Sequence, residues 1–457
     1  MITTIKKQPK NRILGPEDFT KIAQTMQEVF EAQPEMIAQT TQFIQRKRKF
    51  TASQWIQAAV VTYAKYPNAS LENLAEQLYD SFGISISEQA ISQRFQQPKT
   101  RNFHQKMLEM VLQHFLQIPP KVGKIAEVFR GIYVGDCTTL ALPDDLHDTL
   151  PGCGNQYHQA NASLKIFCRY ELFSGNYRDI IFDAGKSSDQ KLYQNARPLE
   201  SGSLELLDLG FFSTKRFENL SRSGIYWISR VPSKTVLTYN GQESSLVDFL
   251  KTFPKKQRDV CIQLGADKVP CRLVAIRAPK DVVSKRIERL NKDAKRQNIK
   301  VSEERLWMTA WTVYVTNIPA EMVSVKGIYD LYGLRWQVEL LFKHWKGEVW
   351  LDKSQGRTGE RILCEIYLKL LCELVTTLIM NLSGGPLNGI SRKKIHKKVR
   401  EHLLRIPRVF ALNDLGYLAK MLQRTHKEIA FIRKQKRRKK KTNAFQTLRN
   451  IRPKPLN

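Results

Sequence analysis

The sequence predicts an α/β protein in which a segment rich in strands lies between two helical segments. Residues 1–120 carry apolar side chains at helical spacing, as in Leu71, Leu74 and Leu78. Short β-favouring runs begin after Ile118-Pro119-Pro120, and residues 361–430 return to helical spacing. The chain has 457 residues, of which 42% are hydrophobic, so it can build more than one domain with a large core.

The predicted elements of residues 121–231 follow the order strand, strand, strand, helix, strand, helix, strand. The strands are Val128–Val134, Ala162–Leu172, Tyr177–Phe182, Leu204–Leu207 and Ile225–Val231, and the helices are Asp189–Arg197 and Lys215–Leu220. This is the element order of a ribonuclease H-like core. Residues 232–320 interrupt the core with further predicted strands and one helix, namely Val236–Tyr239, Val260–Leu264, Cys271–Arg277, Trp307–Thr316 and, for the helix, a part of Asp281–Lys300.

The charge of the chain indicates a polyanionic partner. Lysine and arginine number 74 against 43 aspartate and glutamate residues, which gives a net charge of +31. Nucleic acid is the usual partner for a surplus of this size. The basic run Arg433–Lys441 is either a solvated tail or a further contact with phosphates.

The sequence favours a cytoplasmic protein. The N-terminal residues lack the apolar run of a secretion signal. The most apolar stretch, Ile362–Met380, contains Glu365, Lys369 and Glu373, which favours a buried helix over a membrane span. The seven cysteines are scattered without zinc-site spacing, as expected of reduced core residues.

A helix-turn-helix outline lies within the N-terminal segment. Gly83 ends a helical pattern, and Ser87 can cap a second helix. That second helix exposes Gln89, Gln93 and Arg94, whose side chains can reach base edges in DNA. A plain helical hairpin is the alternative, and the net charge of the chain is what favours DNA binding.

The stretch Tyr332–Lys346 combines a polar and an apolar stripe. At about 100° per residue, one continuous helix would place Tyr332, Arg335, Glu339 and Lys346 on one narrow face. Apolar residues lie beside them, as a helix packed on a core requires. His344 points to the opposite side from Glu339.

The spacing of these four residues resembles the Tyr-Arg-Glu-Lys signature of DDE insertion-sequence transposases. The resemblance implies that Glu339 is the last of three metal-binding carboxylates, and that Tyr332, Arg335 and Lys346 contact DNA phosphates near the scissile bond. Several such transposases also carry a β-rich insertion before the final glutamate. For Trp336 the two interpretations are packing against the insertion and stacking on an extruded base.

The other two carboxylates are expected at strand ends. Asp136 follows the first predicted strand, where a carboxylate would be costly without a partner. Asp208 follows the strand after a helix and begins an Asp-x-Gly-aromatic pattern. Asp183 is the rival for the second position, but it comes one strand too early for the topology.

Three carboxylates can hold two Mg²⁺ or Mn²⁺ ions about 3.5–4 Å apart, since hard cations prefer oxygen ligands. We therefore expect Asp136, Asp208 and Glu339 to be catalytic metal ligands. The resemblance implies a cut-and-paste transposase that binds terminal inverted repeats of double-stranded DNA as a synaptic homodimer. A metal-dependent nuclease without strand transfer and a transposase-derived DNA-binding regulator are the alternatives.

The expected domain organisation follows from these assignments. Residues 1–120 form a helical DNA-end-binding domain, and residues 121–231 and 321–360 form the catalytic core. Residues 232–320 are the β-rich insertion. Residues 361–430 add helices for dimerisation, and residues 431–457 are a basic tail. No membrane partner is expected.

Overall fold

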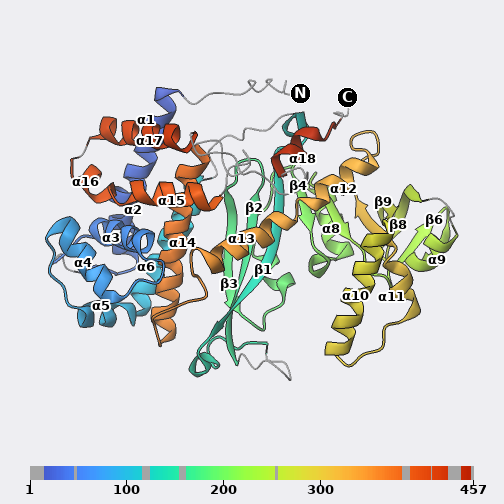
Figure 1. Ribbon diagram of the computed structural model, residues 1–457, viewed down its shortest axis with the longest axis horizontal. Helices are drawn as coiled ribbons and strands as arrows, with labels where there is room; N and C mark the ends of the chain where they lie inside the picture. Colours follow the sequence, from blue (N-terminus) through green and yellow to red (C-terminus); the bar gives the residue numbers. More distant parts are fainter. Residues whose placement is uncertain are drawn as a thin grey trace. The chain divides into compact units, whose positions relative to one another are not determined.

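The computed structural model of the chain describes residues 15–45, 49–115, 124–153, 161–252, 256–382, 392–412, 414–430 and 444–453 (Figure 1). They belong to two compact units. The first contains Met1–Lys121, Cys137–Ser187 and Glu339–Phe445, and the second contains Val122–Asp136, Ser188–Val338 and Gln446–Asn457. The predicted basic run Arg433–Lys441 lies outside the described residues.

The first unit is mainly helical. Its helices are α1 (Pro16–Gln27), the π-helical turn η1 (Glu28–Ala32), α2 (Gln33–Thr40), α3 (Ala52–Lys65), α4 (Leu71–Phe82), α5 (Glu88–Phe95), α6 (Pro98–Phe115), the 3-10 turn η3 (Asp144–Leu146), α14 (Gly359–Leu382), α15 (Arg392–Leu403), α16 (Ile406–Ala411) and α17 (Leu415–Ala430). Strands β2 (Ala162–Glu171) and β3 (Tyr177–Ala184) pair antiparallel, and the sheet order here is β3-β2-β1.

Helix α14 forms the centre of this unit, between helices α3 and α6 on one side and strand β3 on the other (Figure 1). Its side chains from Leu368 to Val375 are buried all round the helix. Its buried charges have partners: Glu365 accepts from Ser354 Oγ at 2.6 Å, and Lys369 donates to the Trp350 carbonyl at 3.1 Å. The prediction of a buried helix is therefore confirmed, and among the described residues no helix is long and apolar enough to cross a membrane.

The turn between α4 and α5 has the geometry that the sequence predicts. Gly83 ends α4 with a φ of +67°, a left-handed conformation that favours glycine. The Ser87 side chain accepts a hydrogen bond from the Ala90 backbone N–H at 3.3 Å and so caps α5. Both helices pack on the unit through buried apolar side chains, namely Leu71, Leu74, Leu78, Ile91 and Phe95.

The second unit contains most of the sheet. Strand β1 (Ile132–Leu142) is shared by the two units, and the order continues β1-β4-β5-β10-β9-β8-β6-β7. The strands are β4 (Leu204–Leu207), β5 (Tyr226–Arg230), β6 (Val236–Tyr239), β7 (Gln242–Ser245), β8 (Gln257–Leu264), β9 (Val269–Arg277) and β10 (Trp311–Thr316). Strands β1, β4 and β5 are parallel to one another, whereas β5 and β10 and the pairs beyond them are antiparallel.

The helices of the second unit connect and cover these strands. They are η2 (Lys124–Glu127), α7 (Asp189–Gln194), η4 (Leu209–Phe211), α8 (Thr214–Arg222), α9 (Leu246–Lys251), α10 (Lys280–Arg296), α11 (Glu303–Met308) and α12 (Val325–Gly333), and α18 (Ala444–Asn450) begins in the first unit and ends in the second. Phe217 of α8 stacks on Trp227 of β5 with ring centroids 4.1 Å apart, which fixes the crossover helix on the sheet. The element order β1, β2, β3, α7, β4, α8, β5 confirms the predicted α/β core.

Several strand boundaries differ from the prediction, among them the end of β1 and the start of β10. Strand β1 continues to Leu142, so Asp136 lies within the strand and not at its end. Cys137, Thr138 and Thr139 favour extended backbone, which explains the continuation. Before β10, residues 303–308 form helix α11, capped by the Ser302 side chain, so the strand begins at Trp311 and not at Trp307.

The predicted continuous helix Tyr332–Lys346 is wrong. Helix α12 ends at Gly333, and α13 (Trp336–Gly347) begins after a turn at Leu334 and Arg335. In this turn the Arg335 N–H bonds the Tyr332 carbonyl at 3.0 Å, a contact of the tighter i to i−3 type. Glycine is a weak helix former, which makes Gly333 a favourable place for the interruption.

Candidate active site

The register of two parallel strands brings Asp136 and Asp208 to one place in the second unit. Val134 of β1 pairs with Leu206 of β4. Asp136 and Asp208 each follow by two residues, Asp136 after Val134 and Asp208 after Leu206. Side chains two residues apart lie on the same face of a sheet. Neighbouring strands are about 4.8 Å apart, so the two carboxylates face the same space.

Arg335 bridges these two carboxylates. Its Nη1 lies 3.3 Å from Asp136 Oδ2, and its Nε lies 3.5 Å from Asp208 Oδ1. The Arg335 side chain is 15% exposed, against 21% and 32% for the two aspartates. The turn between α12 and α13 thus directs a cation to the point where the two negative charges meet.

Tyr332 supports the end of β4. Its hydroxyl donates to the Leu207 carbonyl at 3.3 Å and lies 3.5 Å from Asp208 Oδ1. Burial, together with the Asp208 charge, raises the pKa of Tyr332, so the phenol stays protonated and can donate. Tyr332 is buried. A role in holding Asp208 therefore fits its position better than the predicted contact with a DNA phosphate.

A second set of contacts holds the segment after Asp208. The Arg216 guanidinium donates to the Phe211 carbonyl and to Gln190 Oε1, each at 2.5 Å, and lies 3.9 Å above the Tyr193 ring. These contacts fix η4, for which Asp208 is the residue before the first turn. No sequence motif marks Arg216, because Gln190 and Tyr193, two of its partners, lie on the separate helix α7.

Asp183, the rival for the second carboxylate, has a different environment. It lies on β3 in the first unit, two strands from β1 in the sheet order. Its Oδ1 accepts the neighbouring Ala184 N–H at 2.8 Å. Asp208, by contrast, lies on the strand that pairs with β1 and shares a guanidinium with Asp136.

Helix α13 carries the remaining residues of the signature. Glu339 and Lys346 belong to the first unit, where the exposed Lys346 donates from Nζ to the Thr139 carbonyl at 3.1 Å. Trp336, in the second unit, is 48% exposed. About half of its surface is therefore covered and half is accessible.

The three predicted DNA-reading residues of α5 do not behave alike. Gln89 and Gln93 are exposed, as expected of side chains that reach base edges. Arg94 is partly buried: its guanidinium carbon lies 4.7 Å from the Phe50 ring centroid, and Nη1 donates to the Phe43 carbonyl at 3.4 Å. Burial lowers the pKa of Arg94. Arg94 thus packs against other residues of its own unit, and of the three side chains only those of Gln89 and Gln93 are exposed.

The donor set around Asp136 and Asp208 fits a divalent cation. Both side chains offer carboxylate oxygens, the ligands that Mg²⁺ and Mn²⁺ prefer. The bridging Arg335 already supplies positive charge between them, at distances of 3.3 and 3.5 Å.

Comparison with known proteins agrees with this geometry. Residues 131–374 match the family model described as transposase DDE domain, which is more than half of the chain. A transposase for insertion sequence element IS1151 of Clostridium perfringens is 24% identical over 380 residues, covering 79% of this chain and 80% of that protein. A transposase for element IS231F of Bacillus thuringiensis subsp. israelensis is 26% identical over 362 residues, covering 74% and 75%.

A more distant relative is a putative transposase InsL for element IS186A of Escherichia coli (strain K12), 26% identical over 280 residues, 57% of this chain and 72% of that protein. The matched region of the family model includes Asp136, Asp208, Arg335 and Glu339, the residues on which the sequence analysis depended. The chain therefore belongs to the DDE transposase family of insertion sequences, a family of ribonuclease H-like enzymes that act on DNA and generally use divalent metal ions.

Proposed function

We propose that this transposase moves its element by a cut-and-paste route, cutting both transposon ends and joining them to target DNA. The observation that carries the proposal is the pair Asp136 and Asp208 on adjacent parallel strands, bridged by Arg335. Glu339 is the third carboxylate in this proposal. It lies on helix α13, four residues after Arg335, as in the transposase signature that the sequence resembles.

In this proposal Asp136, Asp208 and Glu339 hold two Mg²⁺ ions. Bound at this place, such ions would supply an activated hydroxyl and would stabilise the leaving oxygen of an in-line displacement at phosphorus. Lys346, whose side chain is exposed, and Arg335 contact phosphates around the scissile bond. Tyr332 holds the carboxylate of Asp208 in place. Because the phosphodiester is exchanged and not consumed, joining requires no nucleotide cofactor.

Recognition of the terminal repeats belongs, in the same proposal, to residues 1–120. The turn at Gly83 and the exposed Gln89 and Gln93 of α5 support this assignment. Trp336 is available to stack on an extruded base, since half of its surface is open. The enzyme works as a homodimer in the prokaryotic cytoplasm, at the nucleoid. Within residues 361–430 the helices that follow the buried α14 form the dimer contact, and the basic tail binds DNA.

Substitution of each aspartate by cysteine tests the metal ligands. A thiolate replaces a hard oxygen by a soft sulfur, which weakens Mg²⁺ binding far more than binding of the more thiophilic Mn²⁺. Asp136→Cys and Asp208→Cys should lose cleavage in Mg²⁺ and regain part of it in Mn²⁺. Asp183→Cys is the matched control on β3 and should cleave equally well in both metals. Selective rescue of Asp183→Cys would instead assign the second ligand to β3.

Product analysis separates the proposed function from its alternatives. Joined strands in a reaction with terminal-repeat DNA indicate transposition, whereas linear fragments alone indicate a nuclease. Glu339→Gln should keep end binding and lose cleavage, because the substitution removes a metal-binding charge and preserves shape. Specific binding without any cleavage by the wild-type chain would identify a DNA-binding regulator.

A further inference from the structure

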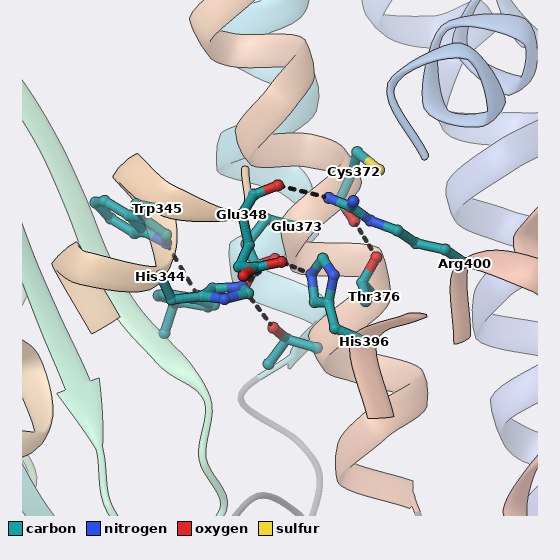
Figure 2. Close-up of polar contacts among 10 residues, drawn as sticks. His344, Trp345, Glu348, Cys372, Glu373, Thr376, His396 and Arg400 are labelled. Carbon is teal, nitrogen blue, oxygen red and sulfur yellow. Dashed lines mark hydrogen bonds and ion pairs between the residues drawn. The ribbon is translucent and has the colours of Figure 1, made fainter. Parts of the chain in front are cut away.

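A second cluster of potential metal ligands lies in the first unit, apart from the aspartates on β1 and β4. It consists of His344 on α13, Glu373 on α14 and His396 on α15 (Figure 2). The ligating atoms all lie within 4.8 Å of one another, and among the described residues this is the one group of at least three such side chains. All three residues are buried, with 8%, 1% and 3% of their surfaces exposed.

Both imidazoles point at the same carboxylate oxygen. The Nε2 atoms of His344 and His396 lie 3.3 and 2.5 Å from Glu373 Oε2. The two rings are 4.7 Å apart, centroid to centroid. Figure 2 shows them approaching Glu373 from two separate helices. Three helices therefore bring two nitrogens and one oxygen to a common point.

The other oxygen of Glu373 is already occupied. Its Oε1 accepts hydrogen bonds from the Tyr177 hydroxyl at 2.9 Å and from Thr377 Oγ1 at 3.3 Å. The Tyr177 hydroxyl in turn accepts from Trp345 Nε1 at 3.2 Å. Hydrogen bonds of this kind orient the carboxylate ligands of protein metal sites. They leave Oε2 directed toward the two histidines.

We propose that His344, Glu373 and His396 bind a transition-metal ion of the zinc type. Imidazole nitrogens favour Zn²⁺ over Mg²⁺, and two histidines with one glutamate are a known ligand set for Zn²⁺. Tetrahedral bonds of about 2.0–2.1 Å place neighbouring ligand atoms about 3.3 Å apart. The His344 to Glu373 distance already has this value, and His396 needs to retreat by less than about 1 Å.

The bound ion would connect α13 to α14 and α15. Helix α13 also carries Glu339 and Lys346, so the ion would fix the helix from the side opposite to Glu339. The role is structural, and it does not depend on whether the chain cuts or joins DNA. A test can therefore rely on metal content and on the melting temperature without any measurement of transposition.

The experiment uses the full chain, purified without a metal-affinity tag, loaded with Zn²⁺ and dialysed against excess Mg²⁺. We expect about one bound zinc per chain by elemental analysis and, after chelation, a fall in melting temperature of about 5 °C or more. Retention in excess Mg²⁺ excludes zinc held only by the oxygen ligands. The proposal is overturned if the wild-type chain retains no zinc and its melting temperature does not change on chelation. The three side chains would then form only a hydrogen-bonded cluster.

Two variants assign the ion to the cluster. His396→Gln keeps an N–H donor for Glu373 and removes the metal-binding nitrogen, so it should lose both the zinc and the chelator-dependent shift. His402→Gln, on the same helix and equally buried, should keep both. Zinc that persists in His396→Gln would also overturn the assignment. If His396→Gln does not fold, His344→Gln is compared in its place, and the wild-type result decides independently.

Discussion

Replacing Arg335 with glutamine removes the cation between Asp136 and Asp208. Its two contacts, at 3.3 and 3.5 Å, are long and join partly exposed side chains, so each is worth about 0.5–1 kcal/mol. Two carboxylates about 5 Å apart then repel each other by roughly 1–3 kcal/mol at the effective dielectric constant of a protein surface. The free energy of unfolding without metal should fall by about 2–5 kcal/mol.

Magnesium should reverse this loss, because a divalent ion replaces the missing positive charge. The folded Arg335→Gln variant then binds Mg²⁺ more tightly than the folded wild type does, since no guanidinium competes for the carboxylate oxygens. A change of 1.4 kcal/mol is about tenfold in affinity, so an increase in Mg²⁺ affinity of roughly tenfold or more is expected. Urea unfolding with a chelator and with millimolar Mg²⁺ measures the first effect, and calorimetric titration measures the second. DNA cleavage should nevertheless decline, as the phosphate contact is lost.

Arg101→Gln is the matched control. Arg101 Nη1 lies 2.8 Å from Glu360 Oε1, with the two side chains 31% and 28% exposed, and both residues belong to the first unit. Its removal should lower the free energy of unfolding by the same amount with and without Mg²⁺. The reasoning about Arg335 is refuted by a loss in Arg335→Gln that Mg²⁺ leaves unchanged, or by weaker Mg²⁺ binding in that variant.

Three further predictions concern stability. Burial lowers the pKa of His104 to about 3, so as the pH falls below about 6.5 this histidine is protonated in the unfolded chain before it is protonated in the folded one. Between neutral pH and pH 5 the wild type should therefore lose about 2 kcal/mol of stability that His104→Gln retains. Equal losses in the two proteins would contradict this. Gly83→Ala should lower the free energy of unfolding by about 1 kcal/mol because Gly83 has a φ of +67°. Gly333→Ala should leave it unchanged, because Gly333 has open space around it and no positive φ. Thermal melts compare the two variants, and equal losses would refute the backbone strain at Gly83. On α13, Trp345→Ala should lower the free energy of unfolding by about 3–5 kcal/mol and Trp336→Ala by less than about 1 kcal/mol, because the two side chains are 0% and 48% exposed. The reverse order in urea unfolding would be inconsistent with these positions.

Local pattern was sufficient to predict most of the fold. Strand β4 ends at Leu207, as predicted, because the leucine-rich segment Leu204–Leu207 and its pairing with β5 stop at the same residue. The helix after it has a serine cap and helical spacing, and both are visible in sequence. Strand β1 was predicted too short, since nothing local marks where a run of β-favouring residues stops pairing.

The active-site geometry was only partly predictable. The residue types and their spacing predicted Asp136, Asp208 and Arg335 as site residues, but a helical wheel assumes an unbroken helix. The turn at Leu334 and Arg335 invalidates that assumption, and it is this turn that directs the guanidinium to the aspartates. Arg94 likewise fits the pattern of a DNA-reading residue, yet Phe43 and Phe50, which are distant in sequence, bind its side chain.

The cluster of His344, Glu373 and His396 had no sequence signal. Its members are separated by 29 and 23 residues, as the numbering shows, and they lie on three helices, so no short motif records them. The helical wheel did indicate that His344 faces away from Glu339, but a wheel cannot name the partner on the other side. Only tertiary packing brings the two nitrogens to the same carboxylate oxygen.

Two metal sites with different ligands would respond differently to chelation. The aspartates offer oxygen alone and favour Mg²⁺, whereas the histidine cluster offers nitrogen and favours Zn²⁺. A strong chelator removes both ions, so a loss of cleavage after chelation does not by itself identify the carboxylates as the cause. Adding back Mg²⁺ refills the oxygen site without repairing α13, and adding back stoichiometric Zn²⁺ does the reverse. Cleavage that requires both additions, and a melting temperature that recovers with Zn²⁺ alone, would follow directly from the two ligand sets.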